Sequence, residues 1–171
     1  APRGLDERGP TGSETAQPYG KHRRELELFF QERYRNSRVI RLPGIYGPQL
    51  RKNALFDLLH GNEVEKLDGR ATLQWYDVRR LWSDLCWAAR AGLREVNFTT
   101  APVRLSDAAR RAFGVVVPDK SEGTPASYDL RTQHSQLWGR ADGYLQSSEE
   151  VLDGLAGWVE QERQQQQERK P

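Results

Sequence analysis

Tyr19 and Arg23 have the types and the spacing of an acid–base pair on one face of a helix. Side chains four residues apart are neighbours on a helix surface, so the guanidinium would lie beside the phenol. A phenol has a pKa of about 10 in water, and it exchanges protons at neutral pH only when nearby positive charge lowers that value. The pair therefore predicts general acid–base chemistry. The alternative is that the Tyr19 ring packs at the helix start while its hydroxyl meets water.

A second segment, about twenty residues further on, joins an apolar strand to a loop rich in glycine and proline. Residues 39–42 (VIRL) are expected to form a short buried strand. Pro43 and Gly44 end it and begin a loop with the sequence PGIYGP. The strand and its loop would lie close to the Tyr19 helix in a compact α/β unit.

The two segments together resemble the catalytic helix and the following strand and loop of the extended short-chain dehydrogenase/reductases, the NAD(P)-dependent epimerase/dehydratase family. Residues 18–27 read PYGKHRRELE, and residues 41–48 read RLPGIYGP. The family's helix carries Tyr-x-x-x-Lys, and Arg23 stands where the Lys is expected. The resemblance extends in order and spacing to about residue 162. It implies an α/β fold, namely the C-terminal part of a Rossmann-like NAD(P)-binding fold with parallel strands and a small, mainly helical substrate-binding lobe.

The resemblance also implies roles for individual residues. These are the catalytic pair Tyr19 and Arg23, the cofactor contacts Pro43, Gly44 and Ile45, and the substrate contacts Asn53, Tyr76 and Arg131. Core packing is the alternative for Tyr76, and a surface ion pair is the alternative for Arg131. Asn97, on a second strand, is expected to hold a loop with its side chain. No residue is carried over for the family's catalytic Ser or Thr, because Thr11, Ser13 and Thr15 lie too close to Tyr19.

Members of the family contain a glycine-rich dinucleotide-binding turn, and this sequence lacks one. Such a turn places glycines between a first strand and a helix, so that backbone N–H groups hold the pyrophosphate. No apolar strand precedes Gly4, Gly9 or Gly12, and Gly139 and Gly143 lie in a loop after a helix. We therefore expect weak or absent NAD(P) binding by this chain alone, with an N-terminal half supplying the cofactor site.

Two functions remain open on these grounds. The resemblance implies an NAD- or NADP-dependent epimerase/dehydratase-type oxidoreductase that acts on a nucleotide sugar or a related carbohydrate. The alternative is a non-catalytic relic or protein-interaction module derived from that family. The missing glycine-rich turn and the Arg at position 23 favour the second. The partner expected besides the substrate is a missing N-terminal half or a second copy of the chain.

Composition excludes several classes of protein. The chain has 171 residues, of which 36% are hydrophobic and 29% charged, which is typical of a soluble globular domain. The 26 basic and 24 acidic residues are spread along the chain, so we expect no nucleic-acid partner. No apolar run is long enough to span a membrane, and the single Cys86 suits the cytoplasm. The three histidines are isolated from other ligand types, so no metal site is predicted.

Periodicity and turn residues predict the order of the elements. Residues 1–17 are expected to be a loop or disordered arm, residues 18–163 the partial Rossmann-like and substrate-binding domain, and residues 164–171 a disordered Gln-rich tail. Helices are predicted over about 19–36, 50–60, 79–91, 106–113, 133–138 and 149–163, with Gly61 capping the end of the second and Ser147 or Ser148 capping the start of the last. Extended segments are predicted over 39–42, 72–78, 95–99 and 115–117. Leu81, Trp82, Leu85, Ala88 and Ala89 are expected to face the core from the third helix.

Overall fold

Two pairs of parallel strands form the centre of the structure, a computed structural model that describes residues 3–9 and 18–168. β2 (Val39–Arg41) pairs with β6 (Glu95–Asn97), and β3 (Gly44–Tyr46) pairs with β5 (Trp75–Asp77). The chain therefore has the predicted α/β class with parallel strands. Each pair closes only after an intervening helix, as parallel pairing requires.

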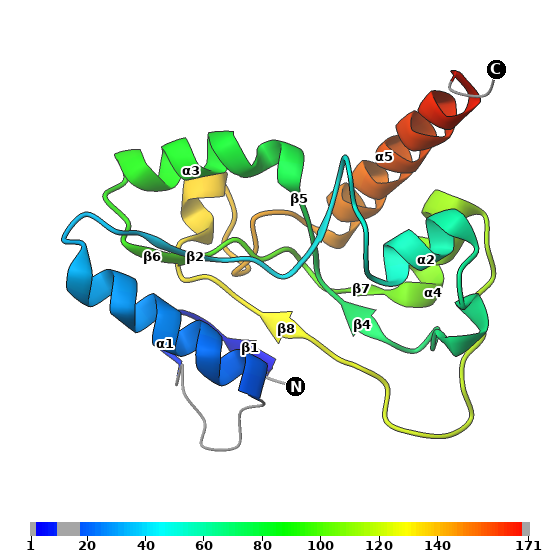
Figure 1. Cartoon of the computed structure of the whole chain (residues 1–171), viewed down its shortest axis with the longest axis horizontal. Coiled ribbons are helices and arrows are strands. Elements are labelled where there is room, and N and C mark those ends of the chain that lie inside the picture. Colours follow the sequence, from blue (N-terminus) through cyan, green and yellow to red (C-terminus); the bar gives the residue numbers. More distant parts are fainter. Residues whose placement is uncertain (1–2, 10–17, 169–171) are drawn as a thin grey trace.

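Helices cover the β2–β6 pair on both sides. α1 (Pro18–Arg33) lies on one side of the pair, and α3 (Leu81–Arg90) lies on the other (Figure 1). At the opposite end of the molecule, α2 (Ala54–His60), α4 (Leu105–Ala108) and α5 (Ser148–Glu168) form the helical lobe. A π-helical turn, Ala109–Phe113, continues α4. Among the described helices, none combines the length and the apolar character that crossing a bilayer demands.

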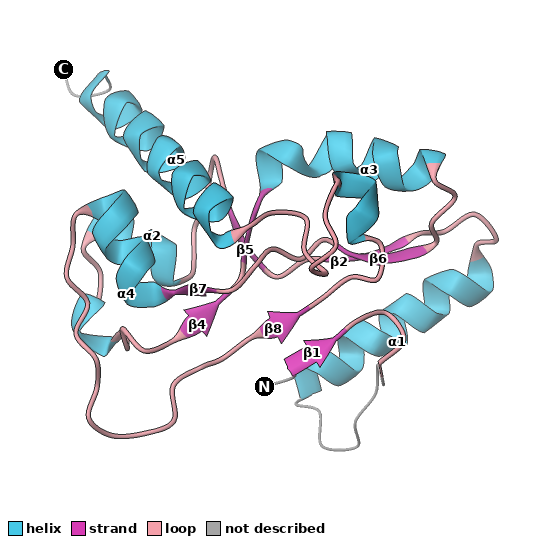
Figure 2. Ribbon diagram, turned by 180° about the vertical axis from the view of Figure 1, so that it is seen from behind, coloured by secondary structure: helices cyan, strands magenta, loops and turns pink. Residues whose placement is uncertain are grey.

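Two further strand pairs connect these ends. β4 (Thr72–Leu73) pairs antiparallel with β7 (Val103–Arg104), and β1 (Arg3–Leu5) pairs parallel with β8 (Asp129–Leu130). Figure 2 shows β1 and β8 side by side, between α1 and the helical lobe. Single 3-10 turns occupy Val64–Lys66, Val78–Arg80 and Ser135–Trp138.

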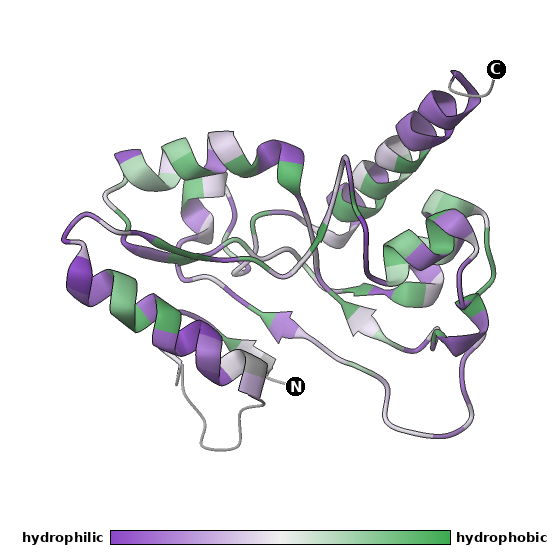
Figure 3. Cartoon of the chain, in the orientation of Figure 1, coloured by the Kyte–Doolittle hydropathy of each residue, from purple (hydrophilic) through white to green (hydrophobic). Residues whose placement is uncertain are grey.

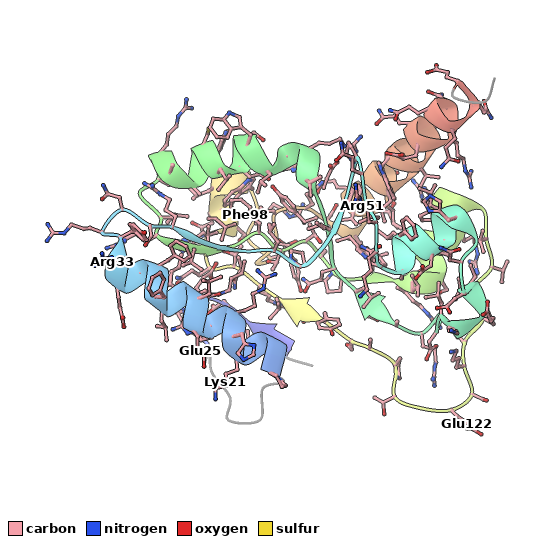
Figure 4. The ribbon with its side chains drawn as sticks, in the orientation of Figure 1. Lys21, Glu25, Arg33, Arg51, Phe98 and Glu122 are labelled. Carbon is pink, nitrogen blue, oxygen red and sulfur yellow. The ribbon has the colours of Figure 1, made fainter. Side chains whose placement is uncertain are left out.

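Each end of the molecule has its own apolar core. The larger core lies in the helical lobe, and its fully buried side chains include Leu55, Leu155 and Trp158. The smaller core lies between α3 and the β2–β6 pair, and it contains Val96, Phe98 and Tyr76. Phe98 lies under α3 (Figure 4) and stacks on the Tyr76 ring at 5.8 Å between centroids.

The helix ends follow local sequence signals. Gly61 ends α2 in the left-handed conformation, with φ of 68°, as the predicted glycine cap requires. α5 starts with a reciprocal capping box, in which Ser147 Oγ accepts from the N–H of Glu150 at 3.2 Å and the Glu150 carboxylate accepts from the N–H of Ser147 at 2.6 Å. The predicted serine cap of this helix is confirmed.

Three boundaries differ from the predictions. β1 lies inside the expected N-terminal loop, because this strand is fixed by backbone pairing with β8 and carries no apolar pattern of its own. α5 continues to Glu168, since Gln and Glu favour a helix and neither Gly nor Pro interrupts them; its outer half is hydrophilic (Figure 3). Residues 115–117 form no strand, and Val117 is instead a buried core residue.

The predicted core face of α3 is correct in part: Leu81, Leu85 and Ala88 face the smaller core, whereas Trp82 and Ala89 do not. Trp82 is 77% exposed and Ala89 is exposed, whereas the side that faces the core carries Asp84 and Ala88. The 3-10 turn Val78–Arg80, capped by Asp77, precedes the helix and sets its rotation. Asp84 was missed because an aspartate looks like a surface residue in the sequence, although it is buried on the same face as Ala88.

α1 is attached to the strands by charges rather than by a buried apolar face. None of its described side chains is buried, and Leu26, Phe29 and Phe30 are 49%, 55% and 43% exposed. Glu27 accepts two hydrogen bonds from Arg41 of β2, at 3.0 and 2.7 Å. Arg41 also bonds Glu95 of β6 at 3.1 Å, and Gln31 of α1 donates to the same carboxylate at 2.6 Å. Polar contacts therefore hold the helix that carries Tyr19.

The Glu27 carboxylate is predicted to make the stability of the chain depend on pH. Burial opposes its ionisation, but hydrogen bonds from Arg41 and Arg24 outweigh burial and lower the pKa of Glu27 below its usual value. The resulting stability is present above the unfolded pKa of about 4.3 and is lost as the pH falls through the lower folded pKa. Glu27→Gln should therefore lower the free energy of unfolding at pH 6, and the difference should shrink progressively below about pH 4.

Urea denaturation at several pH values measures this difference. Glu25→Gln is the control, because Glu25 is an exposed carboxylate on the outer side of the same helix (Figure 4). A Glu27→Gln effect that is the same at pH 3.5 and at pH 6 would contradict the prediction.

Candidate functional site

A cavity of about 410 Å³ lies where the loop before β3, the start of α2 and two strand segments meet. It is lined by Leu42, Pro43, Gly44, Asn53, Ala54, Leu73, Gln74, Trp75, Tyr128 and Leu130. None of these described residues carries a charge. Apolar and aromatic surface with two amides is the lining expected for a neutral ring rather than for an anion.

The buried amide of Gln74 joins the walls of this cavity. Gln74 is 3% exposed. Its amide nitrogen donates to the Leu130 carbonyl at 2.8 Å, and its amide oxygen accepts from the Leu130 N–H at 2.8 Å. The side chain thus makes the two hydrogen bonds that the backbone of a neighbouring strand would make. The nitrogen also donates to the carbonyl of Thr100 at 2.6 Å. The Thr100 hydroxyl in turn donates to the Trp75 carbonyl at 3.0 Å. The amide is thus satisfied by backbone on both sides.

Asn53 fixes the rim of the cavity in a strained conformation. Its backbone has φ of 146° and ψ of −179°, a region that residues other than glycine rarely adopt. Its amide oxygen accepts from the N–H groups of Leu55 and Phe56 at 3.0 and 3.1 Å, and its amide nitrogen donates to the Ile45 carbonyl at 2.9 Å. These three bonds tie the start of α2 to β3. The hydrogen bonds on both sides keep Asn53 in this strained conformation. Strained residues that are fixed in this way are common at functional sites.

Gly44 makes room for the cavity wall. A side chain placed there would begin 3.1 Å from the Gln74 carbonyl oxygen and 3.1 Å from the Trp75 ring. Such contacts are tighter than side chains normally make, so the close approach of the loop to Trp75 depends on glycine.

Of the predicted cofactor and substrate contacts, the structure brings Pro43, Gly44 and Asn53 together around this cavity. Ile45 contributes its carbonyl to Asn53, while its side chain is 39% exposed. The loop that leads from β3 to α2 carries Arg51, which lies at its exposed side (Figure 4).

Tyr76 is not placed to contact a ligand. It is fully buried, and its hydroxyl donates to the Asp84 carboxylate at 2.7 Å. Burial, followed by that hydrogen bond, raises the pKa of the Tyr76 phenol well above its usual value. The core-packing interpretation is therefore correct for Tyr76, because its strand turns this side chain toward the smaller core.

Arg131 likewise lies away from the cavity. Its guanidinium pairs with Asp129 at 3.3 Å and lies over the Tyr144 ring, 5.2 Å from the centroid. Burial, with the hydrogen bond to Asp129, raises the pKa of Tyr144 to about 12. The surface ion pair, which was the alternative for Arg131, is what the structure contains. The predicted loop-holding role of Asn97 is confirmed, since its amide donates to the Arg131 carbonyl at 2.9 Å.

Arg23, one of the two predicted catalytic residues, does not line this cavity. Tyr19 lies in the first turn of α1, and its side chain is outside the described part of the chain. Arg23 is exposed and lines a surface depression with Leu26, Phe30 and Ile40. The two sets of lining residues have no member in common.

The described residues do not fit the pyrophosphate of a dinucleotide. Gly4 and Gly9 lie within and just after the short strand β1, and Gly139 and Gly143 flank the turn after Ser135–Trp138. No helix of this chain begins at a glycine-rich turn in the described residues. Nor does that part of the chain contain a group of three or more His, Cys, Asp or Glu side chains able to hold a metal ion.

Several solved structures are similar to this chain. MoeE5 in complex with UDP-glucose and NAD aligns with a TM-score of 0.64 and 18% identity, over 96% of this chain and 61% of that one. A UDP-N-acetylglucosamine 4-epimerase from Bacillus cereus aligns with a TM-score of 0.56 and 15% identity, over 92% of this chain and 59% of that one. A dTDP-glucose 4,6-dehydratase from Bacillus anthracis in complex with NAD aligns with a TM-score of 0.57 and 16% identity, over 92% of this chain and 57% of that one.

These likenesses show the Rossmann-like fold of epimerases and dehydratases, as predicted. The chain spans less than two thirds of the length of each of these structures. No protein-family model and no curated protein sequence matches the chain.

Sequence reasoning missed Gln74 and the role of the 128–130 segment. Gln74 was part of a predicted extended piece, but its amide partners lie 26 and 56 residues away. The available signal was a polar residue between Leu73 and Trp75. That signal marks a buried polar group without naming its partner.

Substitution of Asn53 should separate backbone strain from hydrogen bonding. Asn53→Ala loses the helix cap and keeps the strain, so it should lower the free energy of unfolding by about 2–3 kcal/mol. Asn53→Gly relieves the strain and should cost about 1 kcal/mol or less. Urea denaturation measures both values. At Asn62, an exposed position without a positive φ, Ala should instead be at least as stable as Gly. An Asn53→Ala chain as stable as Asn53→Gly would contradict this account.

Removal of the buried carboxylate beside Tyr76 should destabilise the smaller core. Asp84 is 4% exposed and also accepts from the Trp138 indole N–H at 2.8 Å. Asp84→Ala leaves two buried donors without partners, which should cost about 2–4 kcal/mol. Asp84→Asn should cost less, and Asp107→Ala, at an exposed position, should be nearly neutral. Denaturation midpoints measure the series, and equal effects of Asp84→Ala and Asp107→Ala would show that the buried bonds do not contribute.

Proposed function

We propose that this chain is the substrate-side part of an NAD(P)-dependent epimerase/dehydratase-type enzyme that acts on a nucleotide sugar or a related carbohydrate. One observation carries the proposal: Pro43 and Gly44, which the resemblance assigns to the cofactor, and Asn53, which it assigns to the substrate, line the same uncharged cavity. The similarity of the fold to sugar-nucleotide epimerases and dehydratases supports it.

The chemistry of the cavity favours a neutral, partly apolar ring. Trp75 and Tyr128 provide aromatic surface, and a pyranose ring can lie against such a surface through its C–H groups. The amides of Asn53 and Gln74 are engaged with backbone, so they give the walls a fixed shape. A phosphate would lack a charged partner among the described lining residues, so the phosphates of a nucleotide sugar would extend out of the cavity.

Tyr19 and Arg23 remain the candidate proton-transfer residues in this proposal. Tyr19, as its phenolate, would accept the proton of a sugar hydroxyl and become the phenol, and the positive charge of Arg23 would favour the phenolate before the transfer. An arginine stays protonated, so it would act as a fixed charge and donate hydrogen bonds without releasing a proton. Because the described residues do not hold a pyrophosphate, no hydride-transfer step is assigned to this chain.

A second candidate function is a protein-interaction module. Leu26, Phe29 and Phe30 place half-exposed apolar side chains on α1. Figure 3 shows hydrophobic and hydrophilic stretches alternating along this helix. Exposed aromatic side chains of this kind are enriched at protein interfaces. This alternative predicts no binding of a nucleotide sugar in the cavity.

The test is binding of UDP-glucose to the 171-residue chain, with UDP and NAD as comparison ligands. We expect a saturable Kd below about 1 mM for UDP-glucose, which corresponds to about −4 kcal/mol, and weaker or absent binding of NAD. Gly44→Val should weaken UDP-glucose binding about tenfold or more, because a side chain there fills the cavity wall. Isothermal titration calorimetry and saturation-transfer NMR of the sugar protons measure these effects.

Gly157→Val is the matched control. A side chain at Gly157 meets open space on α5, so the same substitution there should leave binding unchanged. UDP-glucose binding that is absent, or that Gly44→Val leaves intact, would refute the assignment of the cavity and favour the interaction module.

A further inference from the structure

The carboxylate of Glu7 lies among three hydrogen-bond donors that come from two distant parts of the chain. One of its oxygens accepts from the N–H of Asn97 at 2.7 Å and from the hydroxyl of Thr132 at 2.6 Å. The other oxygen accepts from the N–H of Gln133 at 2.9 Å. Both oxygens are therefore used, which is the arrangement that a carboxylate site requires.

The donor on Asn97 belongs to the free edge of β6. The neighbouring residue Phe98 donates its N–H to Arg41, on the β2 side of the strand. N–H groups alternate between the two edges of a strand, so the Asn97 N–H points away from β2. A backbone donor of this kind needs a partner when it is buried, and Asn97 is 5% exposed.

The three donors are held in place without Glu7, and Gln133 lies between Thr132 and His134, which are bonded to each other. Thr132 is 3% exposed, and its N–H donates to the Gly143 carbonyl at 2.8 Å. Its hydroxyl accepts from the N–H of His134 at 3.2 Å, so the hydroxyl proton is directed toward Glu7. Asn97 is fixed by the β2–β6 pairing and by its own amide bond to Arg131. The three donors would thus still converge if the Glu7 side chain were removed.

The segment that carries Glu7, residues 3–9, has few other attachments. None of its described side chains is fully buried. β1 pairs with β8 with a register irregularity, and the Leu5 carbonyl accepts from the N–H of Arg131 at 2.8 Å. Arg131 directly follows Leu130, which lines the cavity. The attachment of this segment is therefore continuous with one wall of the cavity.

We propose that the N–H groups of Asn97 and Gln133 and the hydroxyl of Thr132 form a carboxylate-binding site, and that Glu7 occupies it as a displaceable latch for the segment 3–9. The site is preorganised, so a free carboxylate takes the place of the side chain once the side chain is removed. A carboxylate ligand that competes with Glu7 releases the segment from β8. This inference does not depend on what the cavity binds.

Removal of the latch and its replacement by acetate test the proposal. In Glu7→Ala, the Arg131 N–H should exchange with solvent about tenfold faster or more, because the segment that covers it is no longer held. Acetate should not restore this protection, because it does not tether the segment, but it should slow the exchange of the Asn97 and Gln133 N–H groups in a saturable manner, and chloride at the same ionic strength should not. Adding Thr132→Val to Glu7→Ala should abolish the acetate effect. Hydrogen exchange followed by NMR measures these N–H groups directly.

Glu25→Ala is the matched control, since it removes an exposed carboxylate from α1. In this variant the Arg131 N–H should exchange as slowly as in the unaltered chain. The proposal is overturned if acetate acts no better than chloride, or if the Arg131 N–H is equally protected in Glu7→Ala and the unaltered chain. Should Glu7→Ala fail to fold, its yield of folded protein in acetate and in chloride is compared. Recovery in acetate alone supports the site, and equal failure in both salts refutes it.

Discussion

The arrangement of the cavity depends on the buried amide of Gln74. This side chain pairs with both the N–H and the C=O of Leu130, as a neighbouring strand would, and it also reaches Thr100. An amide in such a position is costly to bury unless all its bonds are made, so the three segments that meet there are held to one geometry. Trp75 and Leu130 face the cavity as a consequence of that geometry. The walls are therefore positioned by a polar constraint even though their surface is mainly apolar.

The same constraint extends along the chain beyond Leu130. Arg131 donates its N–H to Leu5, and the next two residues hold the carboxylate of Glu7. On the far side of Gln74, Trp75 begins β5 and pairs with Gly44, whose lack of a side chain permits close contact. One series of contacts thus connects the segment 3–9, the cavity and the loop before β3. Leu130 lies at the centre of this series, bonded to Gln74 and followed directly by Arg131.

Local signals in the sequence predicted the parts of this structure that are set locally. The strands at 39–41 and 95–97, the glycine that ends α2 and the serine that caps α5 each follow from residues within a few positions, whereas the pairing of the two strands is long-range. Pro43, Gly44 and Asn53, which the resemblance assigns to the cofactor and the substrate, line one cavity. Gln74 and Glu7 were missed because their partners are far away in the sequence, and Asp84 was missed because a buried polar residue looks like a surface residue. The resemblance assigned Tyr76 to the substrate, whereas its full burial and its bond to Asp84 place it in the smaller core.

The helix that carries Tyr19 is held differently from the rest of the fold. Its described side chains bury no apolar surface fully, and its attachment to the strands consists of Glu27, Gln31 and their partners on β2 and β6. Half-exposed ion pairs contribute less than a packed apolar face and are weakened by salt and acid. The larger core around Trp158 and Leu155 has no such sensitivity. The cavity and the Tyr19 helix therefore belong to regions of unequal stability. The charge on Glu27 governs how firmly the helix is attached to the strands.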